Sequence, residues 1–517
     1  MENVSQSATS KISPNVRVLV PGHQALKDPN ELLAAVLELR SAVYSEGQAM
    51  FEEWRPFIRR RSFLISALNL AYYLALRRRD LRPLQAALSP WGLSSLGRIE
   101  PHVLANLDAV LATLAAITNA PESDFPPRPQ LRQFSRGKRM LAYQTAQVFG
   151  RGDGQRRVRI MVTLPSEAAE NYNLVHELVA HGMDCARINC AHDSAEQWES
   201  MVAYVRRASQ ETGRICKVAM DLAGPKSRTA DVIKPKGKLV FKGDAILLTR
   251  EAPSANEAYT AQARCTLTEA LDQVGIGAAV YFDDGKIGTV VEHIRPEGLV
   301  LRVTRARDSG EKLKDDKGVN FPDTDLRLNP LTEKDLHDLD FIAAQADMVS
   351  YSFVQNVEDV HRLQDELEAR AELRQPGLRP LTIFLKIETA SAVRNLPDLI
   401  VHAAGAQPLG VMIARGDLAV EIGWERLAEM QEEIMWLCEA AHVPVIWATQ
   451  VLEGLAKEGL PSRAEITDAA MAERAECVML NKGPYILDAL DILDGVLQRM
   501  QAHQSKKSPQ LRALKSW

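Results

Sequence analysis

Short apolar runs alternate with helical stretches from about residue 158 to residue 500, and this alternation constrains the fold more than any other feature. Amphipathic patterns typical of helices separate most of the runs, for example at 194–209 and 357–373. Such a regular alternation of strands and helices predicts a closed (β/α)8 TIM barrel with parallel strands. The expected strands are 160–164, 185–189, 218–221, 348–352, 383–388, 411–417, 445–449 and 477–481.

One interval breaks the rhythm, because the chain between Asp221 and Met348 is far too long for a single loop. Its composition favours β-structure, and Asp283-Asp284-Gly285 is a hairpin signal. We therefore expect a small β-barrel domain at 230–317, inserted after the third barrel strand, where it could act as a lid. The barrel would then comprise 138–229 and 318–502. The strands expected in the insertion are 239–241, 245–248, 279–282, 289–291 and 299–303.

The two ends of the chain have a different texture. Residues 1–30 are polar and are expected to form a flexible N-terminus. Apolar residues recur at helical spacing from residue 31 onward, which predicts an all-α N-terminal domain within 31–137, ending in a proline-rich linker over 120–137. The basic residues 503–517 are expected to be a disordered tail.

Composition narrows the class of protein. A net charge of −5 argues against nucleic-acid binding, which needs a basic face. The six cysteines lack metal-binding spacing, and free thiols in a reducing, cytoplasmic compartment are expected. The start of the chain lacks the features of a signal peptide. The apolar stretch 63–76 is shorter than the roughly twenty residues that span a bilayer, so no membrane span is expected.

Three charged residues stand at the ends of two neighbouring expected strands. Glu388 and Asp417 are separated by about thirty residues, the length of one βαβ unit, which would bring both carboxylates to one edge of the sheet. Lys386 precedes Glu388 by two positions and so points to the same face. A lysine with two acids can form a site for a hard metal and a phosphate, or a salt bridge that caps two strands. Spacing alone leaves both readings open.

Seven phrases stand in a fixed order over residues 158–500. They are Gly182 to His192, Asp221 to Thr229, Lys317 to Pro322, Leu385-Lys386-Ile387-Glu388, Ala414-Arg415-Gly416-Asp417-Leu418, Ala448-Thr449-Gln450-Val451-Leu452-Glu453 and Pro461-Ser462-Arg463-Ala464-Glu465. With these phrases the chain resembles the pyruvate kinase family. The first resembles the family's Arg-Leu-Asn-Phe-Ser-His element, the second its Asp-Thr-Lys-Gly-Pro-Glu-Ile-Arg-Thr, and the third is similar to its Lys-Gly-Val-Asn-Leu-Pro.

The resemblance implies an enzyme that transfers the phosphoryl group of phosphoenolpyruvate to ADP, giving pyruvate and ATP. It implies Mg²⁺ or Mn²⁺ held by Glu388 and Asp417, whose hard oxygens suit these ions. Catalytic roles would fall to Lys386, Arg187 and Thr449. Substrate-binding roles would fall to Arg187, Arg228, Gly416, Asp417 and Thr449, and nucleotide-binding roles to Asn189, His192, Arg228 and Lys317.

The monovalent-cation site of the family is altered in this chain. Asn189 and Asp221 remain, but Ala191 and Leu222 replace two hydroxyl-bearing ligands. Lys226 stands where potassium-dependent members have glutamate, and its ammonium could take the electrostatic place of the ion. We therefore expect activity that does not require K⁺, with Lys226 as the potassium-substituting residue.

Two further departures concern the proton-delivery region and the chain ends. Residues 481–483 read Asn-Lys-Gly where the family has Ser-Gly-Glu, which could slow protonation of the enolate. The helical domain at 31–137 is an addition to the usual enzyme, and the usual C-terminal effector domain is not recognisable after residue 500. A homo-oligomer is expected. The alternatives are a magnesium-dependent lyase or mutase acting on the enolate of a pyruvate-like substrate, and a non-catalytic phosphoenolpyruvate sensor.

Overall fold

The computed structural model describes residues 28–510, apart from 153, 235, 236 and 238. The described chain divides into two compact units. The first holds the residues up to Ala142 together with Glu439–His442. The second holds Tyr143–Cys438 and the chain from Val443 onward.

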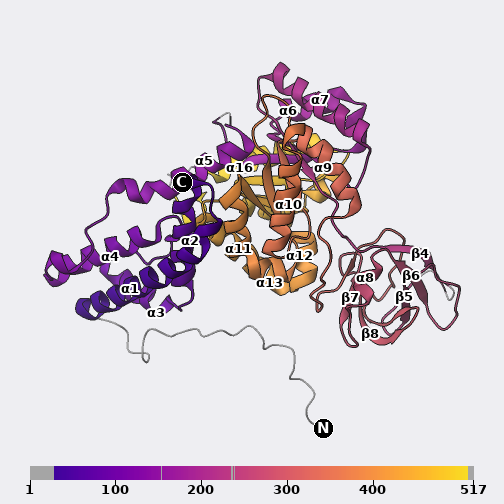
Figure 1. Cartoon of the computed structure of the whole chain (residues 1–517), viewed down its shortest axis with the longest axis horizontal. Helices are drawn as coiled ribbons and strands as arrows, with labels where there is room; N and C mark the ends of the chain where they lie inside the picture. The colour runs from indigo at the N-terminus through magenta and orange to yellow at the C-terminus, as the bar shows by residue number, and fades with distance from the viewer. Residues whose placement is uncertain (1–27, 153, 235–236, 238, 511–517) are drawn as a thin grey trace, which may run out of the picture. The chain divides into compact units, whose positions relative to one another are not determined.

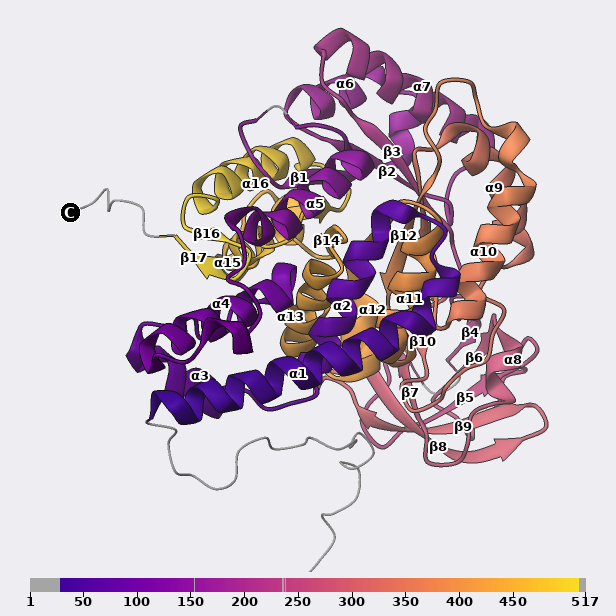
Figure 2. The ribbon, with the colours of Figure 1, turned by 60° about the vertical axis from the view of Figure 1, so that its left-hand side comes forward.

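The first unit is helical, as predicted. Helix α1 (Pro29–Trp54) packs along α2 (Leu64–Arg77) and α4 (Val103–Thr118), with the shorter α3 (Arg82–Leu88) at its side (Figure 2). Apolar residues at helical spacing explain this packing, because they place one stripe of each helix in the core. On α1 the buried stripe includes Leu32, Val36, Leu39 and Val43.

One helical stretch of the described chain, Glu100–Thr118, is long and apolar enough to cross a membrane by length and composition alone. It is not the stretch at 63–76 that the sequence analysis singled out. Its buried residues, among them Leu107, Leu111 and Leu114, face α1 and α2 in the core of the helical unit. The core helix of a folded bundle has the same composition as a short span, so this feature is weak evidence for a membrane segment.

The second unit contains the predicted barrel, and its strands close in the order β1-β15-β14-β13-β12-β11-β3-β2. Every neighbouring pair is parallel, and β1 pairs with β15 to complete the ring. All eight predicted barrel strands are confirmed. They are β1 (Arg159–Thr163), β2 (Cys185–Asn189), β3 (Lys217–Asp221), β11 (Met348–Tyr351), β12 (Thr382–Ile387), β13 (Leu409–Ala414), β14 (Val445–Ala448) and β15 (Cys477–Leu480).

Helices follow the strands and cover the outside of the barrel (Figure 1). Burial of the strands on both faces explains why they read as continuous apolar runs in the sequence. The helices are α6 (Tyr172–Ala180), α7 (Ala195–Thr212), α9 (Glu333–Gln345), α10 (Val357–Ala369), α11 (Ala390–Ala406), α12 (Arg415–Ile422), α13 (Trp424–Ala440), α14 (Glu453–Glu458), α15 (Arg463–Ala472) and α16 (Ile486–Met500).

Aromatic and sulfur-containing side chains fill the barrel interior near the amino ends of its strands. Helix α5 (Leu131–Phe149) contributes Phe149, whose ring centroid lies 5.6 Å from that of Phe384 on β12. Gly410 on β13 makes room for Phe384, because an added Cβ would lie 2.0 Å from its ring. Helix α5 also occupies residues 131–137 of the expected linker, and a short 3-10 helix, Glu122–Asp124, lies near its start. The proline-rich residues 125–130 between them are not helical.

The insertion after β3 is a seven-stranded sheet in the order β10-β7-β8-β9-β5-β6-β4. An antiparallel bridge between Arg228 and Gly318 joins the chain beside the two edge strands, which curls the sheet into the expected barrel-like lid. Asp283-Asp284-Gly285 forms the predicted hairpin turn, with positive φ at each residue. The strands are β4 (Thr229–Ile233), β5 (Ala245–Thr249), β6 (Ala261–Cys265), β7 (Ala279–Phe282), β8 (Ile287–Arg295), β9 (Gly298–Arg305) and β10 (Val319–Asn320).

Two expectations differ from the structure in detail. Residues 239–241 do not form the predicted strand but make a single bridge, between Val240 and Glu311. The chain after Met500 forms a short hairpin, β16 (Gln504–Ser505) and β17 (Ser508–Pro509), where a disordered tail was expected. Lys506 pairs with Glu476 and Lys507 lies over the Trp436 ring, so the basic residues anchor the hairpin. The rest of the expected tail, 511–517, lies outside the described residues.

Candidate active site

A cavity of about 290 Å³ opens at the carboxyl ends of the barrel strands and collects most of the predicted site residues. Its predicted members are Arg187, Asn189, Lys226, Arg228, Lys386, Glu388, Gly416, Asp417 and Thr449. Two predicted residues do not line it. His192 is exposed, and the ammonium of Lys317 lies 3.1 Å from Asp283, next to Asp284 on the cavity wall.

Lys386 is held at the centre of this cavity by three oxygen-bearing side chains. Its Nζ donates to Ser352 Oγ at 2.7 Å and lies 3.1 Å from Glu388 Oε1 and 3.6 Å from Asp221 Oδ2. Burial acts to lower the pKa of Lys386, but the two carboxylates outweigh it, so the pKa is raised. This largely buried ammonium is therefore kept charged at neutral pH.

Arg187, at β2, is fixed by the same aspartate. Its Nε and Nη2 lie 2.9 and 2.7 Å from Asp221 Oδ2, and its Nη1 donates to Thr163 Oγ1 at 3.0 Å. Burial acts to raise the pKa of Asp221, but the guanidinium of Arg187 and the ammonium of Lys386 lower it overall. Asp221 therefore stays ionised and orients both cations.

Glu388 and Asp417 face the cavity from β12 and α12. Glu388 Oε2 accepts a hydrogen bond from the Phe353 amide at 2.7 Å. Burial raises the pKa of Glu388, as does the like charge of Asp417, while the ammonium of Lys386 opposes the shift. Two carboxylates that repel each other across a cavity, both with hard oxygens, fit the predicted Mg²⁺ or Mn²⁺. The described residues contain no cluster of three or more acidic, histidine or cysteine side chains that could hold a metal without substrate.

Lys226 reaches the cavity from the connection between β3 and the lid. Its Nζ lies 2.8 and 3.0 Å from the two carboxylate oxygens of Asp417 and 5.9 Å from the centre of the Phe353 ring. The predicted potassium-substituting residue is thus within the site, on a predicted metal ligand. Its role in replacing K⁺ stays a prediction.

The start of α12 is positioned by an arginine that the sequence analysis left without a role. Arg415 forms a two-pronged pair with Asp468, at 2.5 and 2.8 Å, and its guanidinium lies 4.8 Å from the Trp447 ring centre. Gly416, the next residue, lies close to Thr449, because a Cβ added at Gly416 would lie 3.3 Å from Thr449 Oγ1. The glycine keeps this part of the cavity open.

Ser352 and the amide of Phe353 are the contacts that sequence reasoning missed. Both follow β11, and the expected strand 348–352 already put Ser352 at a strand end, where side chains of a (β/α)8 barrel meet. The signal was therefore present, but a lone serine gave no reason to choose it over its neighbours.

The fold and this cavity define a (β/α)8-barrel protein with an inserted β lid and a strand-end site of clustered lysine, arginine and carboxylate groups. The model of the "Pyruvate kinase, barrel domain" family matches residues 155–485, more than half of the chain. The chain belongs to the pyruvate kinase family.

Named relatives share this part of the chain. "Pyruvate kinase" of Geobacillus stearothermophilus is 31% identical over 360 residues, which cover 67% of this chain and 57% of the relative. "Pyruvate kinase PKLR" of Rattus norvegicus is 30% identical over 363 residues, covering 67% of this chain and 60% of the relative. "Pyruvate kinase 2" of Trypanosoma brucei brucei is 32% identical over 344 residues, covering 63% and 64%. The match thus spans roughly three fifths of the length of these relatives.

Proposed function

We propose that this protein transfers the phosphoryl group of phosphoenolpyruvate to ADP, with pyruvate and ATP as products. The observation that carries the proposal is Lys386, a largely buried ammonium held charged between Glu388 and Asp221 at the centre of the strand-end cavity. Phosphoryl transfer needs positive charge placed where the moving group develops negative charge, more than it needs a nucleophile from the protein. The relatives named pyruvate kinase favour this reaction over other uses of the site.

Each cation around the cavity has a task in the proposed reaction. Lys386 would neutralise the phosphoryl group in flight, and Arg187 would bind phosphate oxygens with its planar guanidinium. Asp221 orients both side chains, so their charges need no rearrangement when substrate arrives. Thr449 and Gly416 would face the enolpyruvate end, where the Gly416–Thr449 approach leaves room for a small carboxylate.

The remaining predicted residues would serve the metal and the nucleotide. Glu388 and Asp417 would hold Mg²⁺ or Mn²⁺, which would supply positive charge to offset the negative charge of the substrate. Asn189, His192, Arg228 and Lys317 would bind ADP on the lid side of the cavity, although His192 and Lys317 do not line the cavity itself.

A pyruvate-release assay with phosphoenolpyruvate, ADP and Mg²⁺ tests the proposal. We expect pyruvate and ATP in equal amounts, and a loss of about 10²–10³ in kcat for Lys386→Met, which keeps the side-chain length without the charge. Pyruvate release without ADP would instead indicate a lyase-type reaction. Phosphoenolpyruvate binding with no pyruvate formed would indicate a sensor.

The same assay tests the proposed independence from K⁺. Because the Lys226 ammonium already lies at the carboxylate edge of the site, we expect turnover to change less than about twofold between KCl and tetramethylammonium chloride at equal ionic strength. Lys226→Glu should introduce a requirement for K⁺. A wild-type enzyme that K⁺ activates about tenfold would contradict this part of the proposal.

A further inference from the structure

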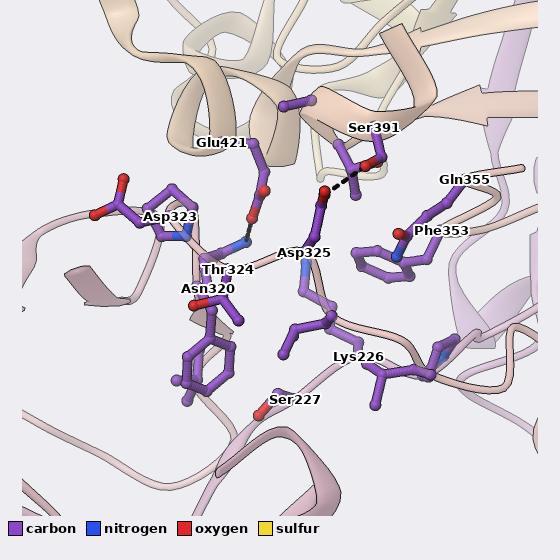
Figure 3. A pocket seen from close by; sticks show the side chains of 18 of the residues that line it. Lys226, Ser227, Asn320, Asp323, Thr324, Asp325, Phe353, Gln355, Ser391 and Glu421 are labelled. Atoms are coloured by element: carbon purple, nitrogen blue, oxygen red, sulfur yellow. Dashed lines mark hydrogen bonds between the residues drawn. The ribbon is translucent and has the colours of Figure 1, made fainter. Parts of the chain in front are cut away.

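A second cavity, of about 300 Å³, lies between the chain returning from the lid and the barrel helices α11 and α12 (Figure 3). It touches the catalytic cavity, since Lys226 and Phe353 line both. Apolar side chains form much of its wall, including Val319, Phe321 and Leu326. None of the predicted substrate or nucleotide residues lies in this second cavity.

Most charged groups on its wall already have partners. Asp325 accepts a hydrogen bond from Ser391 Oγ at 2.6 Å (Figure 3). It also pairs with Arg394 at 3.0 Å. Asp323 accepts from the Ala279 amide at 3.0 Å. Lys226 is engaged by Asp417. The charges of these groups are therefore already balanced or hydrogen-bonded within the protein.

Glu421 and Asn320 differ from these paired groups, because their side-chain oxygens are hydrogen-bond acceptors with few donors nearby. Asn320 is 7% exposed, and its side-chain oxygen has no hydrogen-bond partner among the described residues. Its amide nitrogen makes a long contact, 3.4 Å, with Glu421 Oε1 (Figure 3). Among the described residues, Asn320 is the hydrogen-bond donor to the Glu421 carboxylate. A partly buried carboxylate and a buried carbonyl oxygen without a partner together favour a group with several donors and a positive charge.

We propose that this cavity is a binding site for a small primary amine with an apolar body. The ammonium, with three donors, would lie between Glu421 and Asn320, and the apolar body would lie against Val319, Phe321 and Leu326. A divalent metal fits less well, because it needs six or more oxygen ligands and the other carboxylates are committed.

The electrostatics of Glu421 agree with this site. Burial raises the pKa of Glu421 to about 7, and Asp417, Asp323 and Glu388 act in the same direction, while the Asn320 amide opposes it. Near neutral pH the carboxyl therefore takes up positive charge readily, as a proton or as an ammonium group.

The position of the site connects its occupant to the lid. Asn320 is on β10, the last lid strand, and Glu421 is on α12, which also carries Asp417 of the catalytic cavity. An amine bound to both would join the lid's return strand to the barrel. Occupancy would therefore stiffen the connection between the lid and the barrel.

Titration of the full-length protein with 2-phenylethylamine, followed by ligand-observed NMR or calorimetry, tests the site. We expect the amine to bind about tenfold or more tightly than 2-phenylethanol, which has the same body without the charge. Glu421→Gln should weaken the amine by about tenfold and leave the alcohol unchanged. Equal binding of amine and alcohol, or an undiminished affinity in Glu421→Gln, would overturn the proposal.

Two further variants separate this site from the catalytic carboxylates. Asp417→Asn should retain amine binding, whereas loss of binding there would place the amine in the catalytic cavity and refute the assignment. Thr324→Trp, which fills the second cavity, should abolish binding without removing a charge. Hydrogen exchange should show the amine protecting residues 317–328, and unchanged exchange in that segment would also contradict the site.

Discussion

Asp221 determines the geometry of the site at the residue scale, although it is not among the residues expected to touch phosphoryl oxygens. It is buried, ionised, and bound to Arg187 while lying close to Lys386. The family resemblance connected this position with a monovalent cation. In the structure the same carboxylate orients two protein cations, which gives it a role that does not depend on K⁺.

Asp221→Asn should therefore reduce activity through its neighbours. We expect kcat/KM for phosphoenolpyruvate to fall about 10–100-fold, because Arg187 and Lys386 lose the group that orients them. Asp221 also raises the pKa of Lys386, so the alkaline limb of the pH–rate profile should move to lower pH. A structural role alone would leave that limb in place. Asp488→Asn, on the exposed face of α16, is the matched control and should change neither quantity.

Glu421 provides a prediction about stability that is independent of catalysis. Its folded-state pKa of about 7 lies above the reference value of 4.5, so the folded state binds the proton more tightly than the unfolded state. The stabilisation is full below about pH 4.5 and is lost as the pH rises through about 7. Urea unfolding at pH 8 in EDTA should thus give Glu421→Gln a free energy of unfolding about 1–3 kcal/mol above that of the wild type. At pH 4.5 the two proteins should not differ in this way. An equal difference at both pH values would refute the assignment.

At the scale of elements, the barrel was predictable because its strands are buried on both faces. Most of them contain a continuous apolar run, as in Val445–Ala448, and such runs are visible without any knowledge of their partners. The lid was predicted less completely. Strands β4, β6 and β10 are short or mixed in polarity, and β10 consists of Val319–Asn320 alone, so only pairing across the sheet identifies them.

The site, like the fold, could be predicted from the sequence only in part. Lys386, Glu388 and Asp417 follow from strand ends and spacing, because parallel strands carry their carboxyl-end residues to one place. Their supporting contacts do not follow, since Ser352 follows β11 and Asp468, which holds Arg415, lies on α15, and the approach of both depends on the closed barrel. The expected linker shows the same limit. Helix α5 runs through its last part because the helix is stabilised by its end at Phe149, packed inside the barrel.

Phe149→Ala tests whether α5 is part of the barrel core. Phe149 is 1% exposed and packs on Phe384, so truncation should leave a cavity and lower the free energy of unfolding by about 3–5 kcal/mol. Urea unfolding monitored by far-ultraviolet circular dichroism measures the change. Tyr143→Ala, at a position 58% exposed on the same helix, should alter stability by less than about 0.5 kcal/mol. A small effect of Phe149→Ala would show that the helix end can leave the barrel without loss.

At the scale of the whole molecule, the helical unit is not a simple N-terminal addition. It includes Glu439–His442, which run from the end of α13 towards β14 in the barrel sequence. Within this unit Asn69 Nδ2 donates to the Ala440 carbonyl at 2.8 Å, and Ser66 Oγ lies 2.9 Å from His442 Nδ1. Removal of residues 1–142 would leave the Ala440 carbonyl and the His442 imidazole without these partners. We therefore expect the helical unit to be needed for the stability of the whole chain.

His442 should make the stability of the helical unit depend on pH. Its imidazole is 2% exposed, with Nε2 3.1 Å from the Pro101 carbonyl, and burial lowers its pKa to about 4 from 6.5. Between pH 6.5 and pH 4 the imidazole is protonated in the unfolded state but neutral in the folded state. The stability of the unit is therefore full above pH 6.5 and is lost as the pH falls towards 4. The full loss corresponds to about 3 kcal/mol.

Hydrogen exchange of α2 and α4 measures this loss, because both helices belong to the same unit as His442. We expect the opening free energy of these amides to fall by about 2–3 kcal/mol between pH 7 and pH 4.5, after correction for intrinsic exchange rates. His442→Gln, which cannot take up a proton, should start lower at pH 7 but vary little with pH. His293→Gln, at an exposed position in the lid, should follow the wild type. If His442→Gln kept the wild-type slope, another group would be responsible, and the buried imidazole would be a structural contact without a titration of its own in this range.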